Sequence, residues 1–213
     1  MAKSLPDITD RFVKATSQSL DVAAATEALW LTAPPASAIR QQLKVPQLEA
    51  LYESVYLRMF SAWENALEEL VVYFMAGYES QSYKPVAASG KLFPTVKSAR
   101  AALYGSRDFL LWHNPGQVAE RVEKVLAGCP VEAVIKSSKL EIGRYAAIRH
   151  RVAHDSADAK EKFAAAAKAI TKSSPASAGK MLRAADASEP LNTKKWLIVI
   201  RGRLVDLVQE MAT

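Results

Sequence analysis

One amphipathic stretch, residues 46–77, constrains the fold more than any other feature of the sequence. It opens with Pro46, which suits the first turn of a helix, and it closes at Gly77. Between them, apolar residues recur at steps of three and four, the period of a helix with one buried face. These residues are Leu48, Leu51, Tyr52, Val55, Met59, Trp63, Ala66, Leu67, Leu70 and Phe74. The pattern predicts a long core helix.

The rest of the chain also favours helices. The sequence has only 8 glycines, many alanines and few β-branched runs, and it shows no alternating strand pattern. Amphipathic or alanine-rich segments predict further helices at residues 9–32, 94–104, 115–128, 130–154, 158–172 and 194–212.

Capping and turn residues mark where these helices are expected to start and stop. Asn114 is a typical N-cap and is followed by Pro115 in the first turn. Asp158, with Glu161 three residues later, has the form of a capping box, so the residues just before Asp158 are expected to join two helices. The polar segment 77–94 predicts an irregular connection, and residues 173–180 predict a mobile loop.

These elements together predict an all-α fold. At 213 residues, 50% of them hydrophobic, the chain is long enough for one compact domain with a full core. We expect a single domain over residues 1–213, built as an up-and-down helical bundle. Its core would span about residues 46–170, with an additional N-terminal helix (9–32) and C-terminal helix (194–212).

Charge and cysteine content bear on partners and compartment. A net charge of +6 and a pI near 9.4 suit a polyanionic partner. The single cysteine, Cys129, cannot form an intrachain disulfide and fits a reducing compartment. The longest apolar run, residues 196–200, is too short to span a bilayer, and the first residues show no secretory signal. We therefore expect a cytoplasmic protein with no membrane partner.

The segment AAIRHRVAHDSADAKEKF, residues 146–163, holds two of the chain's three histidines. At about 100° of turn per residue, Tyr145, Ile148 and Val152 form an apolar stripe. His150 and His154 then lie one turn apart on the other side, with Arg149 at the boundary between the two faces.

This combination suits phosphate chemistry. Arg149 offers a planar, permanently charged fork for phosphate oxygens. A histidine that titrates near neutral pH can exchange a proton with a ribose hydroxyl. In RNA the 2′-hydroxyl is an internal nucleophile, so a base and a cation can cleave the strand without a metal, whereas DNA would be inert. On this interpretation RNA would be the substrate, and the reaction would need no metal and no cofactor.

Two other interpretations fit the same spacing. The histidine pair could be half of a zinc site, but Asp155 or Asp158 would have to complete it, because no cysteine or further histidine lies at ligand spacing. The segment could also be a solvated basic helix face, which is the stronger alternative. Spacing by itself does not decide between these interpretations.

The segment IRHRVAHDS, residues 148–156, resembles the Arg-polar-x-x-x-His signature of the HEPN superfamily. Residues 56–78 resemble the core helix of HEPN families associated with bacterial defence. Residues 104–128 are similar to the mid-region of the RiboL-PSP-HEPN branch. The resemblance covers most of the chain, roughly residues 46–170.

The resemblance implies a HEPN-like bundle of four or five helices and a metal-independent endoribonuclease that leaves a 2′,3′-cyclic phosphate and a 5′-hydroxyl. Arg149 would bind and polarise the phosphate, His154 would be the catalytic acid/base at the 2′-hydroxyl, and His150 would orient the phosphate or the other histidine. The resemblance further implies a homodimer with the two motifs facing across a cleft. It also suggests a toxin or defence effector, held by an antitoxin or another defence-system partner protein.

Two departures from the family pattern matter. His150 stands where the family has asparagine, which puts its role in question. Asp155 and Ser156 follow His154, so the tyrosine of toxins that are silenced by nucleotidyltransferases is absent. A catalytically inactive bundle that binds RNA or a partner protein is the main alternative. A DNA-binding regulator is a weaker one, because the sequence shows no helix-turn-helix.

Further residues could support the site. A partly buried arginine needs a counter-charge, and Glu64 is the candidate, whereas Glu68 is expected to face solvent. Arg144 and Arg151 could follow an RNA backbone or belong to a solvated face. We expect His113 to be structural, and we expect three tryptophans to be core residues rather than platforms for base stacking: Trp30, Trp63 and Trp196.

Overall fold

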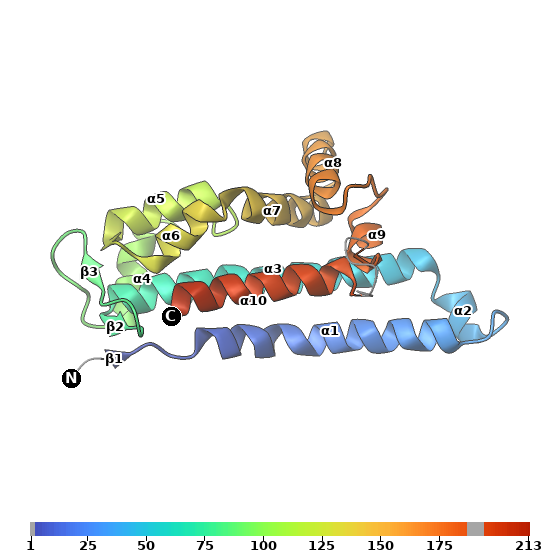
Figure 1. Cartoon of the computed structure of the whole chain (residues 1–213), viewed down its shortest axis with the longest axis horizontal. Helices are drawn as coiled ribbons and strands as arrows, with labels where there is room; N and C mark the ends of the chain where they lie inside the picture. The colour runs from blue at the N-terminus through green and yellow to red at the C-terminus, as the bar shows by residue number, and fades with distance from the viewer. Residues whose placement is uncertain (1–2, 187–193) are drawn as a thin grey trace. The chain divides into compact units, whose positions relative to one another are not determined.

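The computed structural model describes residues 3–186 and 194–213, and this part of the chain is mostly helical (Figure 1). The all-α prediction is confirmed at the level of fold class. Residues 1–2 and 187–193, which the predicted 1–213 domain includes, lie outside the described residues. No helix in the described ranges is both long enough and apolar enough to cross a membrane.

The helices follow the predicted segments with a few differences. They are α1 (Ile8–Thr32), α2 (Ala38–Gln42), α3 (Val45–Met75), α4 (Val96–Tyr104), α5 (Pro115–Val125), α6 (Pro130–Ser137), α7 (Lys139–Ala153), α8 (Ala157–Thr171), α9 (Ala178–Arg183) and α10 (Trp196–Ala212). Four two-residue strands accompany them: β1 (Lys3–Ser4), β2 (Tyr78–Glu79), β3 (Val86–Ala87) and β4 (Leu126–Ala127).

The chain divides into two compact units, each made of separate stretches of sequence. Unit 1 comprises Met1–Val13, Ala62–Gly143 and Leu204–Thr213, and unit 2 comprises Lys14–Ser61 and Arg144–Arg203. The boundaries fall within α1, α3, α7 and α10. The single domain expected for the whole chain stays a prediction.

In unit 1, the second half of α3 carries fully buried side chains, among them Trp63, Leu67 and Leu70. The α5 and α6 helices lie side by side (Figure 1), and both bury apolar residues such as Val118 and Ile135. The predicted N-cap of α5 is confirmed, because the Asn114 side chain accepts a hydrogen bond from the Gln117 N–H at 3.2 Å, with Pro115 in the first turn.

Two short ladders in unit 1 were not expected from the sequence. β1 pairs in parallel with β2, and β3 pairs antiparallel with β4. Both β2 and β3 lie in the segment predicted to be irregular. The helix expected to run to Gly128 ends at Val125, because Leu126 and Ala127 pair with β3 and the Ala127 carbonyl accepts a hydrogen bond from the Tyr83 hydroxyl at 3.0 Å.

The helix expected from Pro130 into the histidine motif is divided in two. Ser138 closes α6, where its N–H donates to the Val134 carbonyl at 3.0 Å. The Ser138 carbonyl then accepts the Ile142 N–H at 3.0 Å, which is the first turn of α7. The interruption lasts one residue, so the histidines still lie near the end of a helix.

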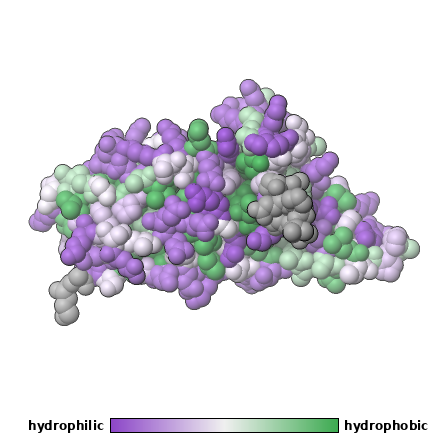
Figure 2. Space-filling view, viewed as in Figure 1, coloured by the Kyte–Doolittle hydropathy of each residue, from purple (hydrophilic) through white to green (hydrophobic). Residues whose placement is uncertain are grey.

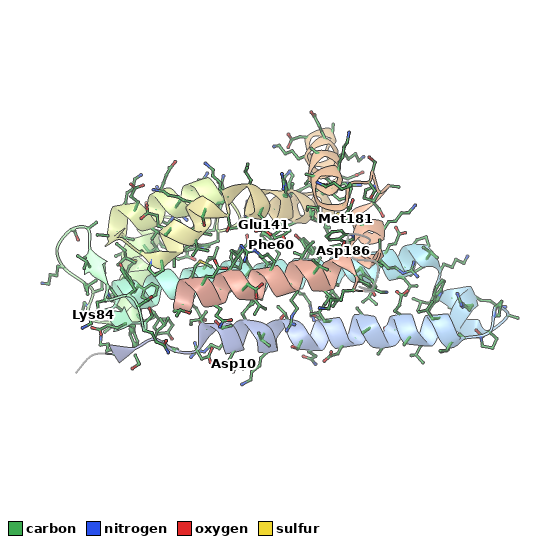
Figure 3. The ribbon with its side chains drawn as sticks, viewed as in Figure 1. Asp10, Phe60, Lys84, Glu141, Met181 and Asp186 are labelled. Carbon is green, nitrogen blue, oxygen red and sulfur yellow. The ribbon has the colours of Figure 1, made fainter. Side chains whose placement is uncertain are left out.

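In unit 2, the first half of α3 packs against α7. The Tyr56 hydroxyl is fully buried and donates a 2.8 Å hydrogen bond to the Tyr145 carbonyl. Phe60 of α3 and Met181 of α9, both labelled in Figure 3, are also buried. The long core helix predicted from the sequence is therefore confirmed as α3.

The α9 helix begins inside the segment predicted to be a mobile loop, residues 173–180. Its cap, Ser177, donates to the Glu49 carboxylate at 2.7 Å, and the Gly179 N–H donates to Glu53 at 2.8 Å. A Cβ at Gly179 would overlap the Glu49 carbonyl oxygen, so only glycine allows this approach. The prediction of a loop was wrong for residues 178–180 because these contacts come from a helix far away in sequence.

The α1 helix occurs as predicted, but some of its apolar side chains are exposed and some of its polar ones are buried. Val22 and Leu29 are 53% and 59% exposed, while Thr16 and Glu27 are buried. The buried polar residues have partners: the Arg201 Nε donates to the Thr16 hydroxyl at 3.0 Å, for example. Hydropathy alone predicts that Val22 is more buried than Thr16 and Glu27, because it takes no account of hydrogen-bond and ion-pair partners.

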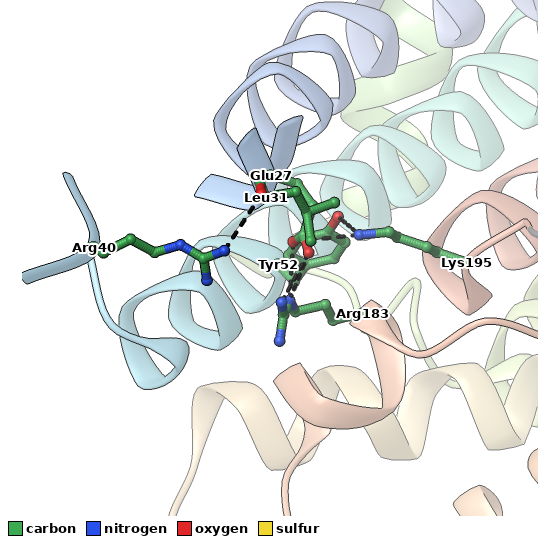
Figure 4. A network of polar contacts seen from close by, with 6 residues as sticks. All are labelled: Glu27, Leu31, Arg40, Tyr52, Arg183 and Lys195. Atoms are coloured by element: carbon green, nitrogen blue, oxygen red, sulfur yellow. Dashed lines mark hydrogen bonds and ion pairs between the residues drawn. The ribbon is translucent and has the colours of Figure 1, made fainter. Parts of the chain in front are cut away.

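Glu27 is the centre of a buried charge cluster in unit 2, which we call the Glu27 cluster (Glu27, Tyr52, Arg183 and Lys195; Figure 4). The Arg183 guanidinium binds both carboxylate oxygens at 2.8–3.1 Å, and the Lys195 ammonium lies 3.3 Å from one of them and 2.7 Å from the Tyr52 hydroxyl. Burial opposes the charge of Glu27, but the two cations outweigh it and lower its pKa. Burial of the Tyr52 phenol raises its pKa to about 12.

The tryptophan prediction holds only for Trp63, which is fully buried. Trp30 and Trp196 are half-buried. The Trp30 ring lies beneath two guanidinium groups, with Arg40 at 3.8 Å and Arg183 at 5.0 Å from the ring centroid. Trp30 therefore supports the edge of the Glu27 cluster through cation–π contacts.

Candidate active site

The candidate site lies in unit 2 at the carboxyl end of α7. Tyr145 and Ile148 of this helix are almost entirely buried, as the periodicity predicts, and so is Ile142, whereas Val152 of the predicted stripe is half-buried. Since these residues fix the inner face of α7, the residues on the other side of the helix are open to solvent. The His150 side chain is 38% exposed, and His154 is exposed.

The two histidines of the motif lie next to each other. Their ring centroids are 4.7 Å apart and the rings are tilted by 52°. The His154 N–H donates to the His150 carbonyl at 2.9 Å, so one more helical turn continues past Ala153. The spacing of four residues thus brings His150 and His154 together on the open face.

Arg149 is half-buried beside this pair. Among the described residues, none forms a hydrogen bond or an ion pair with its guanidinium group. The charge of Arg149 is felt by His150, whose pKa it helps to lower. A permanently charged fork without a carboxylate partner is available for an anionic ligand.

The pKa of His150 is lowered from its ordinary value. Partial burial is the main cause, followed by the neighbouring His154, and Lys162 and Arg149 add to the effect. Asp158 opposes it, with its carboxylate 3.8 Å from the His150 Nε2. The lowered pKa favours the neutral imidazole form of His150, which can accept a hydrogen bond.

Arg151 ties the end of α7 to the turn that follows. Its guanidinium binds Asp155 at 3.1 Å and donates to the His154 carbonyl at 3.3 Å. Asp155 also binds Lys160 at 2.9 Å, and the pKa of Asp155 is lowered, mainly by the hydrogen bond from Lys160. Arg151 thus holds the backbone of His154 in place, whereas Arg144 is exposed and has no partner among the described residues.

The start of α8 differs from the prediction. The N-cap is Ser156, whose hydroxyl accepts a hydrogen bond from the Ala159 N–H at 3.1 Å, and Asp158 lies in the first turn. Ser156 and Asp158 are both residue types suited to this role. As a first-turn residue, Asp158 is free to bind Lys162 at 2.8 Å and to approach His150. Hydrophilic side chains gather over α8 (Figure 2).

The supporting glutamates lie in unit 1. Glu64 binds the Nδ1 of His113 at 3.0 Å, which gives His113 a structural partner just before the α5 cap. Because Arg149 belongs to unit 2, its pairing with Glu64 stays a prediction. The prediction that Glu68 faces solvent was wrong: its carboxylate accepts a 2.5 Å hydrogen bond from the Tyr104 hydroxyl and binds the Arg100 Nε at 2.8 Å.

The carboxylate–lysine pairs around the motif were not predicted from the sequence. Asp155 binds Lys160, and Asp158 binds Lys162. The four-residue spacing from Asp158 to Lys162 is a signal that could have revealed the second pair, whereas Asp155 and Lys160 are five residues apart and carry no such signal. Within residues 3–186 and 194–213, histidine, cysteine and carboxylate side chains form no group of three or more that could hold a metal ion.

Comparison of the chain with protein-family models, with curated proteins and with solved structures finds no match.

Proposed function

We propose that this protein is a metal-independent endoribonuclease of the HEPN type, with its active site at the end of α7. The observation that carries the proposal is the His150–His154 pair, with ring centroids 4.7 Å apart, beside the guanidinium of Arg149, which has no partner among the described residues. A titratable imidazole pair and a free cation on one accessible helix end are the groups that cleavage through a 2′-hydroxyl requires.

Each residue has a distinct part in the proposed reaction. His154 is exposed and removes the proton from the 2′-hydroxyl, whose oxygen then attacks the adjacent phosphorus. Arg149 binds the phosphate oxygens and stabilises the negative charge that develops on them. The bond to the 5′-oxygen breaks, this oxygen takes up a proton from water while protonated His154 returns its proton to solvent, and the products carry a 2′,3′-cyclic phosphate and a 5′-hydroxyl.

His150 and Arg151 position the reacting groups in this scheme. Neutral His150 accepts or donates a hydrogen bond next to His154 and thereby takes the place of the asparagine found in the HEPN motif. Arg151 binds the His154 carbonyl and so fixes the backbone of the acid/base residue. Arg144, exposed on the same helix, is the candidate for contact with the RNA backbone.

The wider role follows from the resemblance to HEPN proteins. We propose a cytoplasmic toxin or defence effector that forms a homodimer with the two motifs at one cleft. An antitoxin or another protein of a defence system would be its partner.

A catalytically silent RNA-binding bundle is the second candidate, and one observation favours it. Asp155 and Asp158 flank the motif, and Asp158 lies 3.8 Å from the His150 Nε2. Carboxylates next to the histidines weaken binding of the scissile phosphate at the motif, so RNA held elsewhere on the protein would not be cleaved. Such a protein would bind RNA without cleaving it.

The experiment is RNA cleavage by purified protein in the presence of a chelator. We expect cleavage by the unmodified protein and a loss of about 10²–10⁴-fold in rate for His154→Ala, since this is the usual contribution of a general acid or base. The matched control is His113→Gln, which removes the chain's other histidine but keeps a donor for Glu64. RNA binding without cleavage by the unmodified protein would favour the silent bundle, and cleavage that survives His154→Ala would overturn the mechanism.

A further inference from the structure

A second candidate binding site lies in unit 1, where the end of α4, the following loop and α5 enclose a cavity of about 770 Å³. Six charged or aromatic side chains in its lining bear on its chemistry: Arg107, Asp108, Phe109, Glu120, Arg121 and Lys124. A volume of this size is typical of sites for small organic ligands. None of these residues belongs to the histidine motif.

Arg121 is the most unusual group in this cavity. Its guanidinium lies over the Trp112 ring, 5.2 Å from the ring centroid, and its Nη1 atom is buried without a hydrogen-bond partner in the described part of the chain. Burial lowers the pKa of Arg121, and the nearby charge of Arg107 lowers it further. A partly desolvated cation without a counter-ion is costly, and an anion in the cavity would relieve that cost.

The other charges leave the cavity with an excess of positive charge. Arg107, Arg121 and Lys124 face two carboxylates, Asp108 and Glu120. In the ranges that the structure describes, no ion pair joins any of these cations to either carboxylate. The cations of the cavity are therefore not paired in local salt bridges, whereas Arg183 and Lys195 of the Glu27 cluster are.

Phe109 adds an aromatic surface at the same place. It is 71% exposed, in a loop whose neighbours Leu110 and Trp112 are buried. An exposed phenyl ring does not contribute to the packing of the core, and it offers a flat face on which a nucleobase can stack. Stacking on an aromatic side chain combined with a cationic groove is the usual way to hold single-stranded nucleic acid.

We propose that this cavity binds a nucleotide, with the base stacked on Phe109 and the phosphate held by Arg107, Arg121 and Lys124. The nucleotide can be free or part of an RNA strand, since both present the same base and phosphate. The proposal rests on the cavity and not on catalysis at α7, so either proposal can fail without the other.

The test uses the full chain carrying His154→Ala, so that RNA would stay intact during the measurement. Binding of a fluorescent single-stranded RNA is followed by anisotropy, and binding of adenosine monophosphate by calorimetry. The test variant combines Arg107→Ala and Lys124→Ala, two exposed residues whose loss leaves the core untouched. The matched control combines Lys84→Ala (labelled in Figure 3) and Lys97→Ala, which removes the same charge from exposed sites of unit 1 outside the cavity.

We expect the test variant to raise the Kd for RNA about tenfold or more and the control to change it less than about threefold. Phe109→Ala is expected to raise the Kd by about fivefold or more, through lost stacking. Binding of the mononucleotide that depends on the same residues assigns the cavity to free nucleotides as well, and binding of RNA alone assigns it to the strand. Equal losses in test and control variants, or no effect of Phe109→Ala, would overturn the proposal.

Discussion

Two charged regions of unit 2 differ in how their charges are satisfied. In the Glu27 cluster the carboxylate is 8% exposed and is bound by a guanidinium and an ammonium group. At the end of α7, His154 is exposed and Arg149 has no partner among the described residues. Charges that satisfy one another hold parts of the chain together, whereas charges left open are available to a ligand. We therefore expect damage to the first region to lower stability and damage to the second to lower activity.

The largest effect on stability is expected from Glu27→Gln. The change leaves Arg183 and Lys195 without their counter-charge in a largely buried place, and the loss of one partner of a buried pair costs about 3–5 kcal/mol. Urea unfolding measures this difference. The control is Glu161→Gln on the exposed side of α8, which is expected to change the free energy of unfolding by no more than about 0.5 kcal/mol.

The comparison would break down if Glu27→Gln unfolded at nearly the same urea concentration as the unmodified protein. It would also break down if the variant lost RNA cleavage while its stability stayed intact, because the cluster would then belong to the functional machinery.

A smaller effect is expected from Ser156→Ala. The substitution removes the side-chain acceptor of the Ala159 N–H at the start of α8, and the loss of such a cap costs about 1 kcal/mol. Thermal or urea unfolding is a suitable measurement. Asp158→Ala is the matched comparison, since the sequence pattern alone favours Asp158 as the cap. If Asp158→Ala lowered the free energy of unfolding more than Ser156→Ala, Asp158 would be the cap, as the sequence pattern predicts.

The smallest effect concerns the pH dependence of stability and involves His150. The folded state lowers its pKa below the ordinary value of 6.5, so the unfolded chain binds more protons as the pH falls through this region. Stability conferred by neutral His150 is present above that value and is lost as the pH falls through the lower, folded pKa. His150→Asn should therefore reduce the loss of stability between pH 7.5 and pH 5, as followed by urea midpoints.

His113→Gln serves as the reference for this pH experiment, because it removes a histidine from unit 1 and leaves the motif unchanged. If His150→Asn left the acid-induced loss of stability as large as in the unmodified protein, the environment described for His150 would be wrong.

The parts of the fold that depend on local sequence could be predicted. The long α3 helix, the Asn114 cap and the buried stripe of α7 each follow from residue spacing within one element. The parts that depend on distant partners could not. Glu27 is buried because Arg183 lies beside it, and these two residues are 156 positions apart in the sequence.

The same distinction applies to the short elements. β4 ends α5 early because β3 offers a pairing partner, and α9 forms because Gly179 can approach the backbone of α3. Nothing in the local sequence around either segment carries this information.

In the candidate site, too, the local geometry could be predicted from the sequence, whereas the contacts across the following turn could not. The helical period places His150 and His154 one turn apart, and the structure brings their rings together. The contacts of Arg151 with Asp155 and of His150 with Asp158 depend on the turn between α7 and α8, and spacing does not define that turn. The chemistry of the pair is the prediction that most needs a direct test.

The most direct test of the account uses a synthetic RNA and its counterpart with a 2′-O-methyl group at the cleaved nucleotide, both incubated with the protein and a chelator. We expect the unmodified RNA to yield 2′,3′-cyclic phosphate and 5′-hydroxyl ends, and we expect no cleavage at the methylated nucleotide, because the nucleophile is blocked. Cleavage at the methylated position, or fragments ending in a 3′-hydroxyl and a 5′-phosphate, would contradict the proposed mechanism.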